Sequence, residues 1–326
     1  METSFKYFLM VAEELNISKA ASKAFITQQS MSTHMKKLEE DLRVTLFNRK
    51  PRLSLTAEGE MLANTLYQIK LLEESYTLQI NDQNTDYRGS LNIGISNSRA
   101  SLIMSDAISK YKQRWHNIDI TLQYDYMSEN MENRIIRGYM DIFVGISEIH
   151  DRDNINIISL HDENIYIVIS DNLAKQYFLT QKIDRKNKSR VIPLSCFADI
   201  PFITNTEGEI SYKIYSQYFN NNNVQLNSIV NSDDARLRAQ LCSLDLGAGI
   251  MTELMLMNVL EYNKTAKHNK LHYYPIRGLS VPSIIAFHKK KPLTTYMKHF
   301  VDIIAEETTS RYENLNLEDT AYIDAV

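Results

Sequence analysis

The sequence of 326 residues predicts an α/β protein with a mostly helical N-terminal module, one long helix, and a larger body of alternating strands and helices. Apolar residues recur at helical spacing through the first 42 residues. The stretch 57–84 lacks proline and has no glycine after Gly59, and strand-like and helix-like runs alternate from residue 90 onward. Because this length exceeds one ordinary core, we expect two or three compact units.

Composition indicates a globular protein without a membrane span. Apolar residues make up 44% of the chain and charged residues 23%, which is close to average usage. No run approaches the roughly 18 consecutive apolar residues of a membrane helix, and charged residues interrupt the N-terminus where a signal peptide would be apolar. We therefore expect a cytoplasmic protein with no membrane partner. The two cysteines, Cys196 and Cys242, lack metal-ligand spacing, so no disulfide framework, metal or cofactor is expected.

Charge is distributed unevenly along the chain, whose net charge is -4. Between residues 17 and 52 there are eight basic and three acidic residues, a surplus of five positive charges, so the remainder carries nine net negative charges. A basic module attached to an acidic body is expected if one end of the molecule binds phosphates and the other does not.

Apolar spacing and capping residues predict three helices in the N-terminal module. The first covers about residues 3–15, in which five apolar residues recur at helical intervals: Phe5, Phe8, Leu9, Ala12 and Leu15. Ser18 is the expected N-cap of a second helix over 19–25, and Thr27 is the expected N-cap of a third that runs to about Leu42. One face of the third helix is apolar and consists of Met31, Met35, Leu38 and Leu42.

The opposite face of the third helix is polar and follows a short turn at residues 25–27. It carries only amides, hydroxyls and a lysine: Gln28, Gln29, Ser32, Thr33 and Lys36. Two helices joined by so short a turn suit a helix-turn-helix, whose second helix enters the DNA major groove. The alternative is that this face is the solvated surface of an ordinary three-helix bundle.

A short hairpin with a basic tip is predicted directly after the three helices. Leu53 and Leu55 alternate inward within residues 47–56, and the tip reads Lys50-Pro51-Arg52. Such a basic wing would contact the DNA backbone or the minor groove beside the recognition helix.

These features together resemble the LysR-type transcriptional regulators. The shared pattern consists of Ala20-Ala21, Thr27-Gln28, Ser32, Leu38-Glu39, Leu46-Phe47-Asn48-Arg49 and Thr56-Ala57-Glu58-Gly59. The sequence departs from the usual family residues at Ala24, Gln29, Arg43 and Thr45. The resemblance implies that residues 1–60 form a winged helix-turn-helix. It also implies that Thr27, Gln28, Gln29, Ser32 and Thr33 contact base edges or adjacent phosphates, that Ser18 and Lys36 contact phosphates, and that Arg52 lies along the minor groove.

A long helix is expected to connect the N-terminal module to the body. Within residues 57–84 a helical stripe of apolar residues consists of Leu62, Leu66, Ile69, Leu72, Tyr76 and Ile80. A helix of this length suggests a coiled-coil partner, although it could instead pack on the second domain of its own chain. The resemblance implies that residues 61–87 pair two chains, that a tetramer can follow, and that the operator is pseudo-palindromic double-stranded DNA. RNA polymerase is a further candidate partner.

The body alternates between predicted strands near 90–96, 118–124, 140–146 and 164–170 and intervening helices, which indicates an α/β sheet. In such sheets, ligands bind beyond the strand carboxyl ends, where helix N-termini present free N–H groups. The turn of residues 96–101, Ser-Asn-Ser-Arg-Ala-Ser, occupies such a position and could hold a carboxylate or similar anion. The alternative is a serine-rich helix cap with Arg99 in solvent.

The resemblance extends to this body, because the effector domain of LysR-type regulators looks like a two-subdomain periplasmic binding protein. It implies an effector domain over 88–309, with subdomain I formed by 88–163 and 269–309 and subdomain II by 164–268. The implied effector-binding residues are Ser96, Ser98, Arg99, Ser128 and Thr204. Residues 310–326 have few apolar groups in periodic order and are expected to be a flexible tail.

No motif of an enzyme is present: the sequence has no Walker loop, HExxH, GxSxG or GxGxxG. We therefore expect a sequence-specific DNA-binding transcriptional regulator that responds to a small-molecule effector. Two alternatives are a solute-binding protein with a helical extension and a scaffold that assembles through the long helix without binding DNA.

Overall fold

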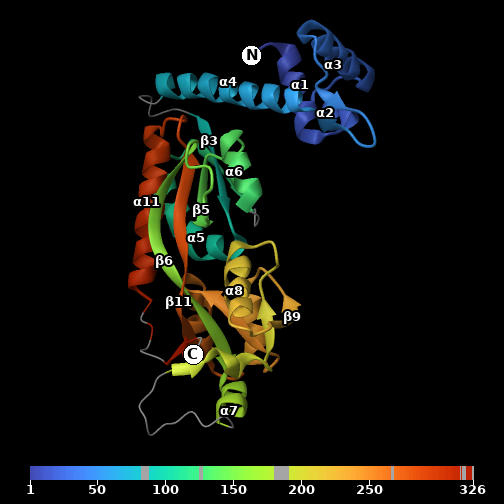
Figure 1. Cartoon of the computed structure of the whole chain (residues 1–326). Helices are drawn as coiled ribbons and strands as arrows, with labels where there is room; N and C mark the ends of the chain where they lie inside the picture. The colour runs from blue at the N-terminus through green and yellow to red at the C-terminus, as the bar shows by residue number, and fades with distance from the viewer. Residues whose placement is uncertain are drawn as a thin grey trace. The chain divides into compact units, whose positions relative to one another are not determined.

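The computed structural model describes residues 1–81, 88–124, 128–179, 191–265, 268–315, 317 and 321–324 (Figure 1). They form two units: an N-terminal unit that contains residues 1–81 and a C-terminal unit that contains nearly all the others. No helix among the described residues is both long enough and apolar enough to cross a membrane.

Three helices form the core of the N-terminal unit: α1 (Thr3–Glu14), α2 (Ile17–Lys23) and α3 (Gln28–Leu42). Phe8, Val11, Ala20 and Met31 are completely buried where these helices meet. The small side chains of α2 allow α1 and α3 to pack closely against it. The three predicted helices are therefore confirmed, because their apolar stripes face one shared core.

Of the two N-caps predicted from the sequence, the structure contains the one of α3 but not the one of α2. Thr27 caps α3 as predicted, since its Oγ1 accepts a hydrogen bond of 3.1 Å from Ser30 N. The prediction that Ser18 caps α2 is wrong, because Asn16 Oδ1 accepts from Lys19 N at 3.0 Å and the helix begins at Ile17. Asn16 has an extended backbone, so its short amide side chain reaches the third N–H of the helix before Ser18 can act.

The predicted wing is present as a hairpin of β1 (Phe47–Asn48) and β2 (Ser54–Leu55), in which Phe47 lies opposite Leu55. Leu53 and Leu55 pack partly against the core, as expected. Leu42, by contrast, is 41% exposed although it was expected on the apolar face of α3. It lies in the last turn, where Arg43 adopts a left-handed conformation and ends the helix beyond the core.

The C-terminal unit is built on a mixed sheet with the strand order β4-β3-β5-β11-β6-β10-β8-β9 (Figure 1). Two parallel sets flank a central antiparallel pair of long strands. One set is β3 (Gly89–Ile95), β4 (Ile118–Gln123) and β5 (Ile142–Ile146), and the other is β8 (Pro201–Thr204), β9 (Asn227–Asn231) and β10 (Ala248–Thr252). The central strands are β6 (Ile155–Ser170) and β11 (Leu271–His288).

The strand predicted at 164–170 is only the second half of β6, which begins at Ile155. Its first half contains His161, Asp162 and Glu163, whose charges hide the strand pattern. Glu163 is nevertheless fully buried, and its partners lie far away in sequence. Local patterning could therefore not predict the full length of β6.

Helices cover the sheet of the C-terminal unit. The two longest are α5 (Asn97–Arg114) and α11 (Thr295–Glu313), which pack side by side (Figure 1), with the Tyr111 and Phe300 rings edge to face at 5.1 Å. The others are α6 (Ser128–Ile136), α7 (Asp171–Leu179), α8 (Ile210–Asn221), α9 (Ala235–Ser243) and α10 (Leu256–Thr265), with short 3-10 turns η1 (Leu194–Phe197) and η2 (Glu253–Met255).

The expectation of a flexible tail over 310–326 is wrong for the residues of this segment that have regular structure. Helix α11 continues to Glu313, and β12 (Tyr322–Asp324) pairs in parallel with β7 (Val191–Pro193). Ile323 is fully buried and lies opposite Ile276 of β11. A single apolar residue in so short a strand gives no periodic signal, and for this reason the sequence does not reveal it.

Candidate functional site

The outer face of α3 is exposed, as the sequence predicts. Gln28, Gln29, Thr33 and Lys36 are exposed and Ser32 is half-buried. Lys36 Nζ lies 3.6 Å from Glu40 Oε1, but both side chains are largely in solvent, so this weak pair leaves the lysine available for a phosphate. The outer face of α3 therefore presents two exposed amide side chains, Gln28 and Gln29, and one cation, Lys36.

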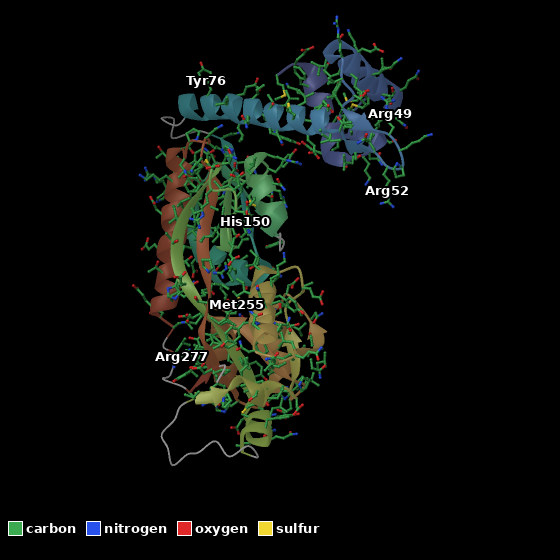
Figure 2. The ribbon with its side chains drawn as sticks, in the orientation of Figure 1. Arg49, Arg52, Tyr76, His150, Met255 and Arg277 are labelled. Carbon is green, nitrogen blue, oxygen red and sulfur yellow. The ribbon has the colours of Figure 1, made fainter. Side chains whose placement is uncertain are left out.

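The hydroxyl groups near this face already have backbone partners. Thr33 Oγ1 donates to Gln29 O at 2.9 Å, so its proton is used within the helix. Thr27 Oγ1 accepts from Ser30 N and keeps its own proton free to donate. Ser18 is exposed in the first turn of α2, and Arg52 is exposed at the tip of the wing (Figure 2).

One motif shared with LysR-type regulators holds the wing against α3. Glu39 Oε1 accepts from Leu46 N at 2.8 Å and from Phe47 N at 3.2 Å, and Glu39 Oε2 lies 3.1 Å from Arg49 Nη2. Leu46 and Phe47 are buried, so these backbone N–H groups need the carboxylate as acceptor. Arg49 is thus occupied by an ion pair, which leaves Lys50 and Arg52 as the basic groups of the tip.

A second shared motif joins the wing to the long helix α4 (Ala57–Asn81). Thr56 Oγ1 donates to Thr45 O at 2.6 Å and accepts from Gly59 N at 3.0 Å. A Cβ on Gly59 would lie 2.2 Å from Leu46 O, so only glycine permits this close approach. The Thr-x-x-Gly pattern is therefore explained by backbone geometry.

The turn between α2 and α3 contains a residue that the sequence reasoning did not single out. Phe25 is 95% exposed and has a left-handed backbone with φ of 56°. Its N–H donates to Ser22 O at 3.2 Å, and Ile26 N donates to Ala21 O at 3.0 Å, which closes the end of α2. The backbone forms this turn, and the Phe25 ring projects into solvent.

The predicted apolar stripe on α4 is divided between core and surface. Leu66 is buried in the N-terminal unit, whereas Ile69, Leu72 and Tyr76 are 40%, 61% and 67% exposed (Figure 2 labels Tyr76). Exposed apolar residues in a row on one helix indicate a surface that another chain can cover.

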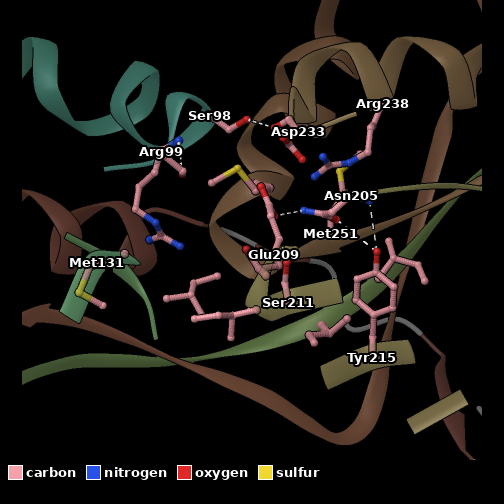
Figure 3. A pocket seen from close by; sticks show the side chains of 18 of the residues that line it. Ser98, Arg99, Met131, Asn205, Glu209, Ser211, Tyr215, Asp233, Arg238 and Met251 are labelled. Atoms are coloured by element: carbon pink, nitrogen blue, oxygen red, sulfur yellow. Dashed lines mark hydrogen bonds between the residues drawn. The ribbon is translucent and has the colours of Figure 1, made fainter. Parts of the chain in front are cut away.

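The C-terminal unit contains a pocket (Figure 3) beside the N-terminus of α5. Ser96, Ser98 and Arg99 line it, as predicted. Ser96 caps α5, and its Oγ accepts from Arg99 N at 3.4 Å. The side chain of Ser128 lies outside what the structure describes.

Ser98 connects α5 to the start of α9. Its Oγ donates to Asp233 O at 2.8 Å and accepts from Ala235 N at 3.0 Å, although the residues are more than 130 positions apart in the chain. The Ser98 hydroxyl therefore has both a donor and an acceptor partner within the protein.

Arg99 is buried in an ion pair. Its Nη2 lies 2.6 Å from Glu163 Oε1, which also accepts from Tyr312 Oη at 2.6 Å. Glu163 Oε2 accepts from Leu254 N at 3.2 Å. Burial alone would raise the pKa of Glu163, but the charge of Arg99 and the hydrogen bonds outweigh burial and hold this pKa below its usual value. Both groups are therefore charged, and they neutralise each other.

Thr204 does not line the pocket. It is fully buried, and its Oγ1 lies 2.7 Å from Ser228 Oγ and donates to Asn231 Oδ1 at 2.9 Å. These bonds join β8 to β9, so within the described structure Thr204 supports the edge of the sheet.

Comparisons with known proteins agree with this arrangement. Residues 3–60 match the family described as "Bacterial regulatory helix-turn-helix protein, lysR family", and residues 84–309 match the "LysR substrate binding domain". The chain belongs to the LysR family of transcriptional regulators.

Curated relatives of this LysR-family chain are also regulators. The HTH-type transcriptional regulator AlsR of Bacillus subtilis (strain 168) is 30% identical over 139 residues, which cover 42% of this chain and 45% of AlsR. This match spans less than half of the relative's length. The uncharacterized HTH-type transcriptional regulator YwqM of the same organism is 22% identical over 300 residues, which cover 91% of this chain and 95% of YwqM.

Solved structures show the same fold at low sequence identity. Full-length OxyR from Pseudomonas aeruginosa has a TM-score of 0.63 at 14% identity, covering 94% of this chain and 97% of OxyR. CbnR, a LysR family transcriptional regulator, has a TM-score of 0.56 at 16% identity, covering 94% of this chain and 99% of CbnR. The predicted fold class is confirmed.

The pocket of this LysR-family chain also contains polar and charged residues that the sequence alone did not identify. Asn205 and Glu209 lie in the segment between β8 and α8, Tyr215 lies on α8, and Arg238 lies on α9 (Figure 3). A signal for Arg238 exists in the sequence: Ala235, Ala239 and Cys242 mark the buried face of α9, and Arg238 falls on that face. A charge at a buried helical position indicates a specific partner or a ligand.

Proposed function

We propose that this LysR-family chain is a sequence-specific DNA-binding transcriptional regulator that responds to a small-molecule effector. The observation that carries the proposal is the outer face of α3, whose exposed Gln28, Gln29 and Lys36 lie opposite the buried Met31 and Met35. The crystal structure of full-length CbnR in complex with its target DNA supports the proposal, since it resembles this chain with a TM-score of 0.55 at 16% identity.

The residues take different parts in this proposal. Gln28 and Gln29 are free amides that can pair with adenine edges, and Ser32 and Thr27 supply hydroxyls beside them. Thr33 accepts rather than donates, because its proton is bound by Gln29 O. Ser18 and Lys36 contact phosphates, and Arg52 lies along the minor groove.

The exposed stripe of α4, namely Ile69, Leu72 and Tyr76, is the proposed surface of a homodimer. Two recognition helices related by a two-fold axis fit a pseudo-palindromic operator. Further contacts between effector domains would form a tetramer, RNA polymerase is a further proposed partner, and the proposed location is the cytoplasm because DNA is the target.

The proposed domains are 1–60 for DNA binding, 61–87 for dimerisation and 88–309 for effector binding, the last divided into 88–163 with 269–309 and 164–268. Ser98 and the Arg99–Glu163 pair join segments distant in the chain around the pocket. An effector that alters these contacts would change the relative orientation of the two subdomains and, through the oligomer, the bend of the DNA.

A gel-shift titration of the full chain on the DNA upstream of its own gene tests the DNA-binding proposal. We expect retardation whose affinity falls steeply with added salt. Lys36→Gln should weaken binding, whereas Lys110→Gln, a control at an exposed lysine of the C-terminal unit, should not. Absence of salt-dependent binding to any duplex would refute the proposal.

A further inference from the structure

Four charged side chains line the pocket: Arg99, Glu209, Asp233 and Arg238. Two of them are already engaged. Arg99 forms the ion pair with Glu163, and Asp233 Oδ1 accepts from Thr206 N at 3.1 Å and from Thr206 Oγ1 at 2.5 Å. Arg99 is thus neutralised, whereas the hydrogen bonds to Asp233 occupy its Oδ1 but leave its charge in place. Glu209 and Arg238 are the remaining pair of opposite charges in the pocket.

Arg238 is 2% exposed and has unused donors. Its Nη1 donates to Ser232 O, while its Nε has no hydrogen-bond partner among the described residues. Burial lowers the pKa of Arg238, which Glu209 opposes, and the guanidinium remains a cation. A buried guanidinium N–H that has no acceptor destabilises the folded protein, unless a ligand atom accepts its hydrogen bond.

Glu209 is the complementary group. Its Oε2 accepts from Asn205 Nδ2 and from Ser211 Oγ, the latter at 3.3 Å, and within the described structure nothing is bonded to Oε1. Burial raises the pKa of Glu209, and the Asn205 bond and the Arg238 charge offset this only in part. Among the residues that the structure describes, Glu209 forms no ion pair.

Glu209 and Arg238 affect each other electrostatically, but they do not form an ion pair in the described structure. Both side chains approach the same space (Figure 3). The cavity there is about 80 Å³, which is room for several waters and hence for a small organic molecule. The apolar lining of this cavity includes Met131, Phe143, Ile165, Ile250 and Met255. A ligand that carries both an anionic and a cationic group would pair with Arg238 and Glu209 at the same time.

Building on the proposed regulatory function, we propose that the effector is a small zwitterion of the amino-acid class, whose carboxylate binds Arg238 and whose ammonium group binds Glu209. This replaces the expectation that Arg99 holds an anion, because Arg99 is neutralised by Glu163. The apolar lining then receives the side chain of the amino acid.

Calorimetric titration of the full-length protein with each standard amino acid tests this inference. For the tightest binder, the matched carboxylic acid without the amino group and the matched amine without the carboxylate are titrated as well. We expect the amino acid to bind about tenfold or more tightly than either analogue, since each analogue leaves either Arg238 or Glu209 without its partner. Equal binding of the carboxylic acid, or no binding of any amino acid, overturns the inference.

Two variants separate the two contacts. Arg238→Gln should weaken binding of both the amino acid and the carboxylic acid, and Glu209→Gln should reduce the affinity for the amino acid to that for the carboxylic acid. Arg236→Gln and Glu207→Gln are matched controls at exposed positions nearby and should bind as the original chain does. Unchanged binding by Arg238→Gln would contradict the proposal.

Operator affinity and circular dichroism of each variant show whether it is folded. If Arg238→Gln does not fold, Arg238→Lys keeps the cation but loses the planar fork, and should bind the amino acid more weakly; unchanged affinity would refute the contact. A protein that binds DNA but no amino acid contradicts this inference alone. A protein that binds an amino acid but no duplex contradicts the proposed regulatory function alone.

Discussion

Arg99 Nη2 and Glu163 Oε1 lie 2.6 Å apart, and both side chains are buried beside the pocket of the C-terminal unit. Glu163 also receives hydrogen bonds from Tyr312 of α11 and Leu254 of η2. One carboxylate therefore ties together α5, β6, η2 and α11. This pair is a structural centre of the C-terminal unit, and it leaves Arg99 with little capacity for a ligand anion.

Removing the negative charge of this pair should destabilise the C-terminal unit strongly. Glu163→Gln leaves the Arg99 cation buried without a counter-ion, which costs about 3–5 kcal/mol of unfolding free energy. Urea denaturation of the full chain measures this loss. Glu261→Gln is the control, since Glu261 is 62% exposed and its pair with Arg236 contributes little. A loss of unfolding free energy below about 1 kcal/mol for Glu163→Gln would show that the Arg99–Glu163 ion pair does not stabilise the fold.

The same carboxylate predicts a pH dependence. The pKa of Glu163 is lower in the folded protein than its usual value, so the folded state favours the ionised form. This contribution is present above the unfolded pKa of about 4.3 and is lost as the pH falls through the folded pKa. The difference in unfolding free energy between the original chain and Glu163→Gln should therefore shrink as the pH is lowered below about 4. A difference that stays constant or grows would contradict the assignment.

The wing should depend on Glu39. In Glu39→Ala, the buried N–H groups of Leu46 and Phe47 lose their acceptor and Arg49 loses its ion pair, for an expected cost of about 1–3 kcal/mol. Thermal unfolding of the N-terminal unit measures the effect. Glu40→Ala, at a 64% exposed side chain on the same helix, should change stability by less than about 0.5 kcal/mol. Equal effects of the two variants would count against a special role for Glu39.

Phe25 should be replaceable with a gain in stability. Its left-handed backbone is costly for a residue with a bulky side chain, and its ring is 95% exposed, so Phe25→Asn should stabilise the chain by about 1 kcal/mol. Phe25→Ala removes the ring but keeps a Cβ at positive φ, and it should give no such gain. A melting temperature that rises equally for both would indicate that exposure of the ring, rather than backbone strain, is responsible.

The parts of the fold that depend on local signals could be predicted from the sequence. Helix α3 and its Thr27 cap, the wing hairpin and the strand near 118–124 each follow from spacing and from residues within a few positions. The position of the α2 cap could not be predicted correctly, because Asn16 and Ser18 are both good caps and only the backbone conformation decides between them.

The candidate site could be predicted only in part. The sequence identifies the turn of Ser96, Ser98 and Arg99 as polar, but it does not reveal that Glu163, 64 positions away, neutralises Arg99. Thr204 was expected to bind the effector, and only the pairing of β8 with β9 shows that its hydroxyl is bonded to Ser228 and Asn231. Partners that come from distant segments have no signal in a single sequence, and they decide which polar groups remain free.

The proposed DNA recognition depends on the exposed face of α3. The most direct test compares the variants Gln28→Ala and Lys36→Ala. Their binding to operator and random duplexes is measured by fluorescence anisotropy over a range of salt concentrations. We predict that Gln28→Ala loses about 1–3 kcal/mol on the operator and almost nothing on random DNA. Lys36→Ala should weaken both duplexes alike and reduce the salt slope by about one. Equal losses on the two duplexes for Gln28→Ala would contradict base recognition by this face.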